Sequence, residues 1–219
     1  MLTFCADGMR ATRLPWWALS GALIIVTTFG ANSVRGDDFV RIEEDWQLVV
    51  LNPDPATFAP QVTCTISPVG HLDSYYGVFD LNLRNLPSYA AGGVQLQIWS
   101  GQVAVSSVKS NTGTLLQNTN ETVTWTQRMS LSNGQLSFSI QNGNSQTWGQ
   151  FGSGNSIALQ VSTDLDNLNN YSSAISVANS GVGYSANRVS SLTLTAVRAY
   201  SASGLAAQNT TPQVVYQHP

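Results

Sequence analysis

Alternation of apolar and polar residues constrains the fold of this chain more than any other feature. Side chains of a β-strand point in turn to the two faces of a sheet, so strict alternation is typical of strands with one buried and one solvated face. A helical period is nearly absent. The sequence therefore predicts an all-β fold, a single antiparallel β-sandwich of about ten to twelve strands, with no helix longer than about two turns. The alternating runs lie at 46–50, 79–84, 94–99, 122–131, 136–141, 157–162 and 192–196.

Turn residues separate these runs. Asn133-Gly134 stands between two of them and predicts a hairpin with a tight loop. Asn142-Gly143 has the same composition and predicts a second hairpin. We expect the sandwich domain at 37–200 and a flexible C-terminal tail at 201–219.

The N-terminal region has the composition of a secretory signal peptide, expected at 1–36. Two arginines precede the apolar run Trp16–Phe29, which is shorter than the roughly 20 residues that span a bilayer. Cleavage is expected after Gly36, with Ser33 as the alternative, and an uncleaved membrane anchor is the other interpretation. Cleavage predicts a secreted or extracytoplasmic protein, at the cell surface or in a periplasm, with no remaining membrane span.

Charge and cysteine content exclude several classes of protein. From residue 37 on, six basic and eleven acidic side chains give a net charge of −5. Nucleic-acid binding requires a basic stripe for phosphates, and the sequence has none. Cys5 leaves with the signal peptide, so Cys64 has no intramolecular partner and is expected to be a buried small hydrophobe.

The strand at 94–99 carries the candidate binding site. Val94, Leu96 and Ile98 fall on one face, so Gln95, Gln97 and Trp99 share the other. Two amides beside an indole suit a sugar, because the amides bond to hydroxyls and the ring packs on the pyranose. Alternatively, these side chains only decorate a solvated sheet, or Trp99 packs under a loop.

Three other tryptophans have different expected places. Trp148, followed by a glycine-rich loop, is a second candidate for contact with a glycan at the rim of the site. Trp46 and Trp125 lie in phase with apolar neighbours and are expected in the core.

Gln95-Leu96-Gln97-Ile98-Trp99 resembles the strand Glu-Leu-Met-Ile-Trp that carries the catalytic nucleophile of family 12 endoglucanases. The resemblance covers roughly residues 90–200 and implies a concanavalin A-like jelly roll, the scaffold of legume-type lectins and several glucanases. Gln95 takes the place of the nucleophile, and residues 175–198 contain no Asp or Glu for the acid/base. A retaining glycosidase needs two carboxyl groups about 5 Å apart. The resemblance thus implies the scaffold without its chemistry.

No other motif predicts a catalytic residue, and the one cofactor that the sequence suggests is calcium. There is no paired-carboxylate spacing and no recognisable triad, so the sequence leans away from an enzyme. The acidic loop after residue 163 is a candidate calcium site, or else a plain polar turn. His71 and His218 are isolated, which argues against a transition-metal site. The candidate calcium ligands are Asp164, Asp166, Asn167 and Asn169.

Two functions follow from these observations. The first is a secreted, non-catalytic, lectin-like module that binds a glycan or another cell-surface component through a concave face with Gln95, Gln97 and Trp99. The second is a structural or cell-surface module that contacts proteins and has no small-molecule ligand. The sequence predicts no oligomeric state.

Overall fold

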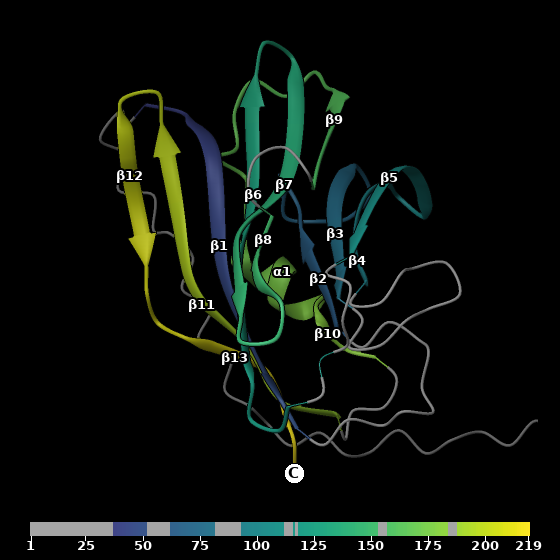
Figure 1. Ribbon diagram of the computed structural model, residues 1–219. Coiled ribbons are helices and arrows are strands. Elements are labelled where there is room, and N and C mark those ends of the chain that lie inside the picture. The colour runs from purple at the N-terminus through teal and green to yellow at the C-terminus, as the bar shows by residue number, and fades with distance from the viewer. Residues whose placement is uncertain are drawn as a thin grey trace, which may run out of the picture. The chain divides into compact units, whose positions relative to one another are not determined.

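The computed structural model describes residues 37–51, 62–81, 93–111, 116, 118–152, 157–183 and 188–219. Within these ranges the chain forms 13 strands and one short helix, arranged as two antiparallel sheets (Figure 1). The prediction of an all-β fold with two packed sheets is confirmed. The segment 1–36, where the signal peptide is expected, lies outside the described residues.

The larger sheet has eight strands in the order β12-β11-β1-β6-β7-β8, with β13 paired to β11 and β9 paired to β7. Its two longest strands, β1 and β11, pair over almost their whole length. The strands are β1 (Phe39–Val50), β6 (Thr122–Ser132), β7 (Gln135–Ser145), β8 (Gly149–Phe151), β9 (Ala158–Ser162), β11 (Val189–Ser201), β12 (Gly204–Asn209) and β13 (Gln213–Gln217).

The smaller sheet has five strands in the order β10-β2-β3-β4-β5. Helix α1 (Ser173–Ala178) contacts β2 of this sheet and hydrogen-bonds to β1 of the larger one, so it lies between the two sheets. Among the described residues, no helix is long and apolar enough to cross a membrane. The strands are β2 (Val62–Ile66), β3 (Tyr75–Leu81), β4 (Gly93–Ser100), β5 (Val103–Asn111) and β10 (Gly181–Val182).

The core lies between the facing sides of the two sheets. Trp46 and Trp125, neighbours on β1 and β6, stack with their ring centroids 6.5 Å apart. Phe79 of the smaller sheet packs against Trp125 at 5.5 Å. The Gln127 amide donates a hydrogen bond of 3.1 Å to the Cys64 carbonyl, which joins the sheets directly. The expected core positions of Trp46, Trp125 and a free, buried Cys64 are confirmed.

The two Asn-Gly pairs have different structures. Asn133 and Gly134 take φ angles of 51° and 70° and form the expected turn between β6 and β7. Asn142 also has a positive φ, 52°, but it lies inside β7. There the pairing of β7 with β6 shifts its register, opposite the β6 residues Thr124 and Thr126. The prediction of a second hairpin is wrong, and this pair forms a β-bulge instead.

The C-terminal segment also differs from expectation. Gly204, with a φ of +128°, allows a tight turn straight after β11, and the chain then pairs with β11 as β12. After residue 212 it pairs with the first part of β11 as β13. The expected flexible tail is therefore a part of the larger sheet, and the sandwich extends past residue 200.

Candidate functional site

The predicted site lies on the outer side of the smaller sheet. Val94, Leu96 and Ile98 are buried, at 1% exposure or less, and Gln97 and Trp99 point the other way and are half-buried. Tyr76 of β3 is the register partner of Trp99, so the two aromatic side chains are cross-strand neighbours. We call Tyr76, Gln97, Trp99 and the exposed Ser107 opposite Gln97 the aromatic face.

Hydrogen bonds orient both rings of the aromatic face. The Trp99 indole N–H donates to the Gln97 side-chain oxygen over 3.4 Å. The Tyr76 hydroxyl donates to the Gly101 carbonyl at 2.7 Å. Burial raises the pKa of the Tyr76 hydroxyl. The rings are thus held in place before any ligand arrives, while the Gln97 NH₂ group has no partner among the described residues.

Two other residues of the predicted site, Gln95 and Trp148, are buried. Gln95 is on the same side of β4 but is buried, at 9% exposure, next to Asp80 on β3. Trp148 is only 8% exposed and belongs to the core, where it meets Phe151 edge-on at 5.6 Å. A bond from its backbone N–H to the Ser145 hydroxyl, 2.9 Å, closes the turn that carries it. The expectation that Trp148 rims the site is therefore corrected, because the turn places its indole in the core.

The candidate calcium loop is used within the fold. Asp164 and Asp166 are exposed. The Asn169 carbonyl oxygen accepts a bond of 2.8 Å from the Phe39 backbone, and its NH₂ donates to Asp38 at 2.7 Å. Asn167 accepts from the Asn169 backbone N–H at 3.1 Å, which forms an Asx turn. Within the described residues, no three His, Cys, Asp or Glu side chains gather around one point that could hold a metal ion.

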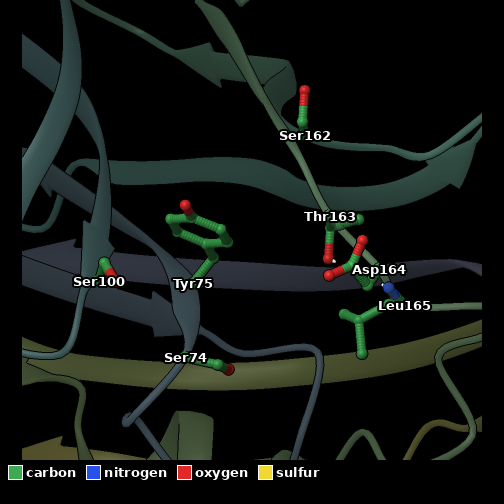
Figure 2. Close-up of a pocket in the computed structure, with 7 residues that line it drawn as sticks. All are labelled: Ser74, Tyr75, Ser100, Ser162, Thr163, Asp164 and Leu165. Atoms are coloured by element: carbon green, nitrogen blue, oxygen red, sulfur yellow. Dashed lines mark hydrogen bonds between the residues drawn. The ribbon is translucent and has the colours of Figure 1, made fainter.

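A pocket of about 560 Å³ lies beside that loop, where β3 begins and β4 and β9 end (Figure 2). Hydroxyl groups dominate its lining, and the ring of Tyr75 and the side chain of Leu165 add apolar surface. Asp164 is the one charged residue among the described residues that line it. The lining residues are Ser74, Tyr75, Ser100, Ser162, Thr163, Asp164 and Leu165.

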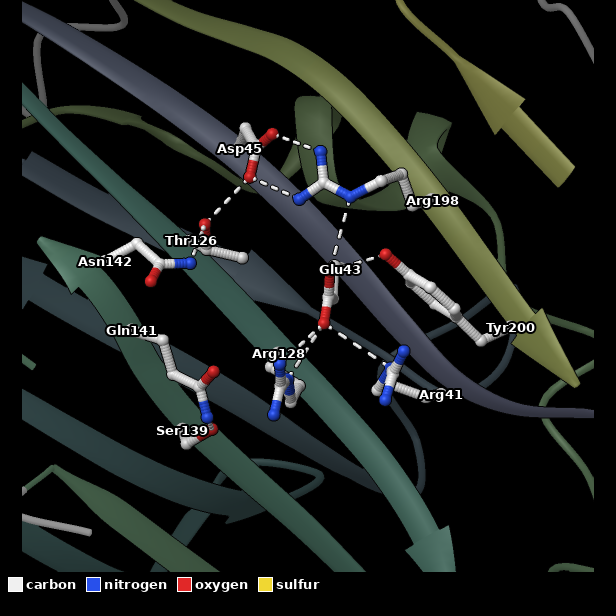
Figure 3. Close-up of polar contacts among 10 residues, drawn as sticks. All are labelled: Arg41, Glu43, Asp45, Thr126, Arg128, Ser139, Gln141, Asn142, Arg198 and Tyr200. Carbon is white, nitrogen blue, oxygen red and sulfur yellow. Dashed lines mark hydrogen bonds and ion pairs between the residues drawn. The ribbon is translucent and has the colours of Figure 1, made fainter. Parts of the chain in front are cut away.

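The outer side of the larger sheet carries a network of charged groups (Figure 3). Glu43 accepts from Arg128 at 2.8 Å, from Arg198 at 3.3 Å and from the Tyr200 hydroxyl at 3.1 Å, and it pairs with Arg41 at 3.4 Å. We call the side chains drawn in Figure 3 the polar face, and they are Arg41, Glu43, Asp45, Thr126, Arg128, Ser139, Gln141, Asn142, Arg198 and Tyr200.

Asp45 is the second anion of the polar face. Both of its oxygens accept from Arg198, one of them at 2.8 Å, which makes a bidentate pair. Asp45 also accepts from Thr126 at 2.8 Å, and the Arg41 guanidinium lies 3.7 Å above the centre of the Tyr200 ring. The three guanidinium groups therefore share two carboxylates, which fixes the side chains in place and leaves these five charged groups with a net charge of 3 − 2 = +1.

Glu44 is a carboxyl group that sequence analysis did not place. It points into the core with no exposed surface and accepts three hydrogen bonds, from Ser176 at 2.5 Å, Tyr171 at 2.7 Å and Trp46 at 3.1 Å. Burial raises its pKa from 4.5 to about 7, and the three donors only partly offset this effect. Glu44 therefore joins β1 to the segment that contains α1.

The alternation of apolar and polar residues along β1 already indicated which carboxylates point inward and which point outward. Glu44 lies in phase with the buried Ile42 and Trp46, so it belongs to the inner side of the strand. Glu43 and Asp45 are in phase with Arg41 and belong to the outer side. Tyr76 could likewise have been found, because it alternates with the buried Gly77 and Phe79.

No family model, no curated protein and no solved structure matches this chain. The function must therefore be argued from the side chains themselves. Two outer surfaces offer fixed, solvent-reachable groups: the aromatic face on the smaller sheet and the polar face on the larger sheet.

Proposed function

We propose that this protein is a non-catalytic, saccharide-binding β-sandwich and that the aromatic face is its binding surface. One observation carries the proposal: Trp99 and Tyr76 stand directly opposite each other on the outer side of a sheet, half-buried, with Gln97 beside them. Neither ring belongs to the hydrophobic core, which lies on the other side of the sheet.

Sugar binding follows from the chemistry of these groups. The flat ring of Trp99 can pack against the C–H side of a pyranose, and the free NH₂ group of Gln97 can donate to a hydroxyl. Each neutral hydrogen bond contributes about 1 kcal/mol net, so a single ring is bound weakly. Because the face is part of an extended sheet, we infer that it binds an extended polysaccharide through several such contacts.

The proposal includes a concanavalin A-like jelly roll and an extracytoplasmic location. Two packed antiparallel sheets, one of eight strands and one of five, support the first. The charged, then apolar, N-terminal sequence before Asp37 supports the second. Mass spectrometry of the protein recovered outside the cytoplasm should give an N-terminus at Asp37 or Val34, and an intact Met1 would contradict cleavage.

The test is a pull-down with insoluble cellulose, β-1,3-glucan, xylan and mannan. Trp99→Ala and Tyr76→Ala each remove one ring of the aromatic face. The matched control is Leu205→Ala, which removes a 55%-exposed apolar side chain from the other sheet. We expect binding to at least one polysaccharide that both aromatic variants lose and the control retains. Absence of binding to all four, or binding that survives both changes, would refute the proposal.

A second candidate function is a protein-contacting module, and the edge of the smaller sheet favours it. Strand β5 is an edge strand, and its Val103 and Val105 are 63% and 49% exposed. Exposed apolar edge strands tend to pair with other chains. Concentration-dependent oligomers that Val105→Lys abolishes, together with no response to the polysaccharides, would support this candidate over saccharide binding.

A further inference from the structure

The larger sheet has a groove on its outer side, at the end of the polar face. The groove has a volume of about 610 Å³, within the range of small-ligand sites. Strands β6, β7 and β9 form its floor, so it is separate from the aromatic face on the other sheet. Its lining residues are Arg128, Ser130, Ser137, Phe138, Ser139, Gln141, Ala158, Leu159 and Gln160.

The strand register aligns these groups in two rows. Arg128, Ser139 and Ala158 are cross-strand partners, and so are Ser130, Ser137 and Gln160. On the other side of β6 the rows continue through Glu43 and Arg198 and through Arg41 and Tyr200. Each row crosses five strands, a length of roughly 19 Å at the usual strand spacing. The small Ala158 at the end of its row leaves the surface hollow there.

Three polar side chains of the groove have no partner among the described residues, whereas Gln141 donates to Ser139 at 3.3 Å. The side chains of Ser130, Ser137 and Gln160 make no hydrogen bond to any other described residue. Arg128 is held by Glu43, through bonds of 2.8 and 2.9 Å. The groove thus offers hydroxyl and amide groups whose positions are fixed by the sheet, beside a guanidinium that is already paired with Glu43.

We propose that this groove is a second binding site, for a neutral saccharide of a few units that lies across the strands. An anionic ligand is disfavoured, because the Arg128 guanidinium that it would need already donates to Glu43. Serine and glutamine side chains match sugar hydroxyls, which both donate and accept hydrogen bonds. Because the two sites are on the outer sides of opposite sheets, one protein molecule can hold two saccharide segments at once.

The test is amide NMR spectroscopy of the full-length chain titrated with cello-, laminari-, xylo- and mannotetraose. We expect at least one tetrasaccharide to shift the backbone signals of residues 137, 139, 158 and 160. The double variant Ser137→Ala/Gln160→Ala should weaken that binding about tenfold or more, because two hydrogen bonds are lost. Thr122→Ala/Gln150→Ala removes a hydroxyl and an amide from exposed positions of the same sheet and should change nothing.

The outcomes separate this site from the aromatic face. Groove shifts that persist in Trp99→Ala support an independent second site, even if the aromatic face binds nothing. Groove shifts that vanish in Trp99→Ala, that are unaffected by the double variant, or that are absent with all four sugars overturn the inference. The signals of buried Trp46 and Trp125 verify that each variant is folded.

Discussion

Tyr171 donates a hydrogen bond of 2.7 Å to Glu44, although 127 residues separate the two in the sequence. Together with Ser176 on α1, it surrounds a carboxyl that has no contact with solvent. The helix segment is thereby attached to the inner side of β1. A titratable group at this point makes the stability of the sandwich depend on pH.

The variant Glu44→Gln should remove that dependence. The folded protein holds the Glu44 proton with a pKa of about 7, against 4.5 for an ordinary glutamate. Stability from this group is therefore fully present below pH 4.5 and is lost as the pH rises through about 7. The free energy of unfolding of the natural protein should fall by about 3 kcal/mol over that window.

Urea unfolding at a series of pH values between 4 and 8 measures the effect. The difference between the natural protein and Glu44→Gln isolates Glu44 from Asp80, whose pKa burial also raises. Cys64 does not interfere in this window, because burial raises the pKa of its thiol well above 9. If the free energies of unfolding of the two proteins changed in parallel with pH, Glu44 would not have a raised pKa in the folded state.

Gly77→Ala should destabilise the sandwich by about 1–3 kcal/mol through overpacking. A Cβ atom at Gly77 would lie 2.5 Å from the Phe138 ring of the opposite sheet, so one of the two strands must move. Gly70→Ala is the matched control, since nothing lies within 4 Å of its Cβ position. Thermal unfolding of the two variants should differ clearly, and equal melting temperatures would contradict the close approach of the sheets.

Glu43→Gln should destabilise the protein by about 2 kcal/mol, because three arginines of the polar face lose a common partner. The remaining guanidinium groups repel one another, so the loss should shrink in high salt. Asp164→Asn makes the same change of charge at an exposed loop position and should be nearly neutral. If the loss of stability in Glu43→Gln did not depend on salt, the ion pairs of Glu43 would not be what stabilises the polar face.

Local pattern was enough to predict much of the sandwich but not its irregularities. The alternation around Trp46 and Trp125 assigned the inner side of β1 and β6 correctly, because burial decides the side of every second residue. Asn133-Gly134 and Asn142-Gly143 have the same composition, yet only the first is a hairpin. A Cβ at Gly143 would lie 2.4 Å from Phe151, its partner on β8, so packing between these two strands requires glycine there.

The candidate sites depend on contacts that the alternation within a single strand does not reveal. Alternation indicated that Gln97 and Trp99 share one side of β4, but their neighbour Tyr76 is supplied by the register of another strand. The burial of Trp148 depends on its edge-on contact with Phe151 and on the Ser145 bond, neither of which a glycine-rich sequence reveals. The groove residues come from three strands and became a group only when those strands were aligned.

Saccharide binding at the aromatic face can be followed through the indole N–H signals of the tryptophans in NMR spectra. Titration with the soluble oligosaccharide of whichever polysaccharide is retained in the pull-down should shift the Trp99 signal, since its indole is half-buried on the aromatic face. The signals of Trp46 and Trp125, which are 1% exposed, should stay in place. A Trp99 signal that does not move while the oligosaccharide binds, or one that moves no more than those of the core tryptophans, would contradict the account.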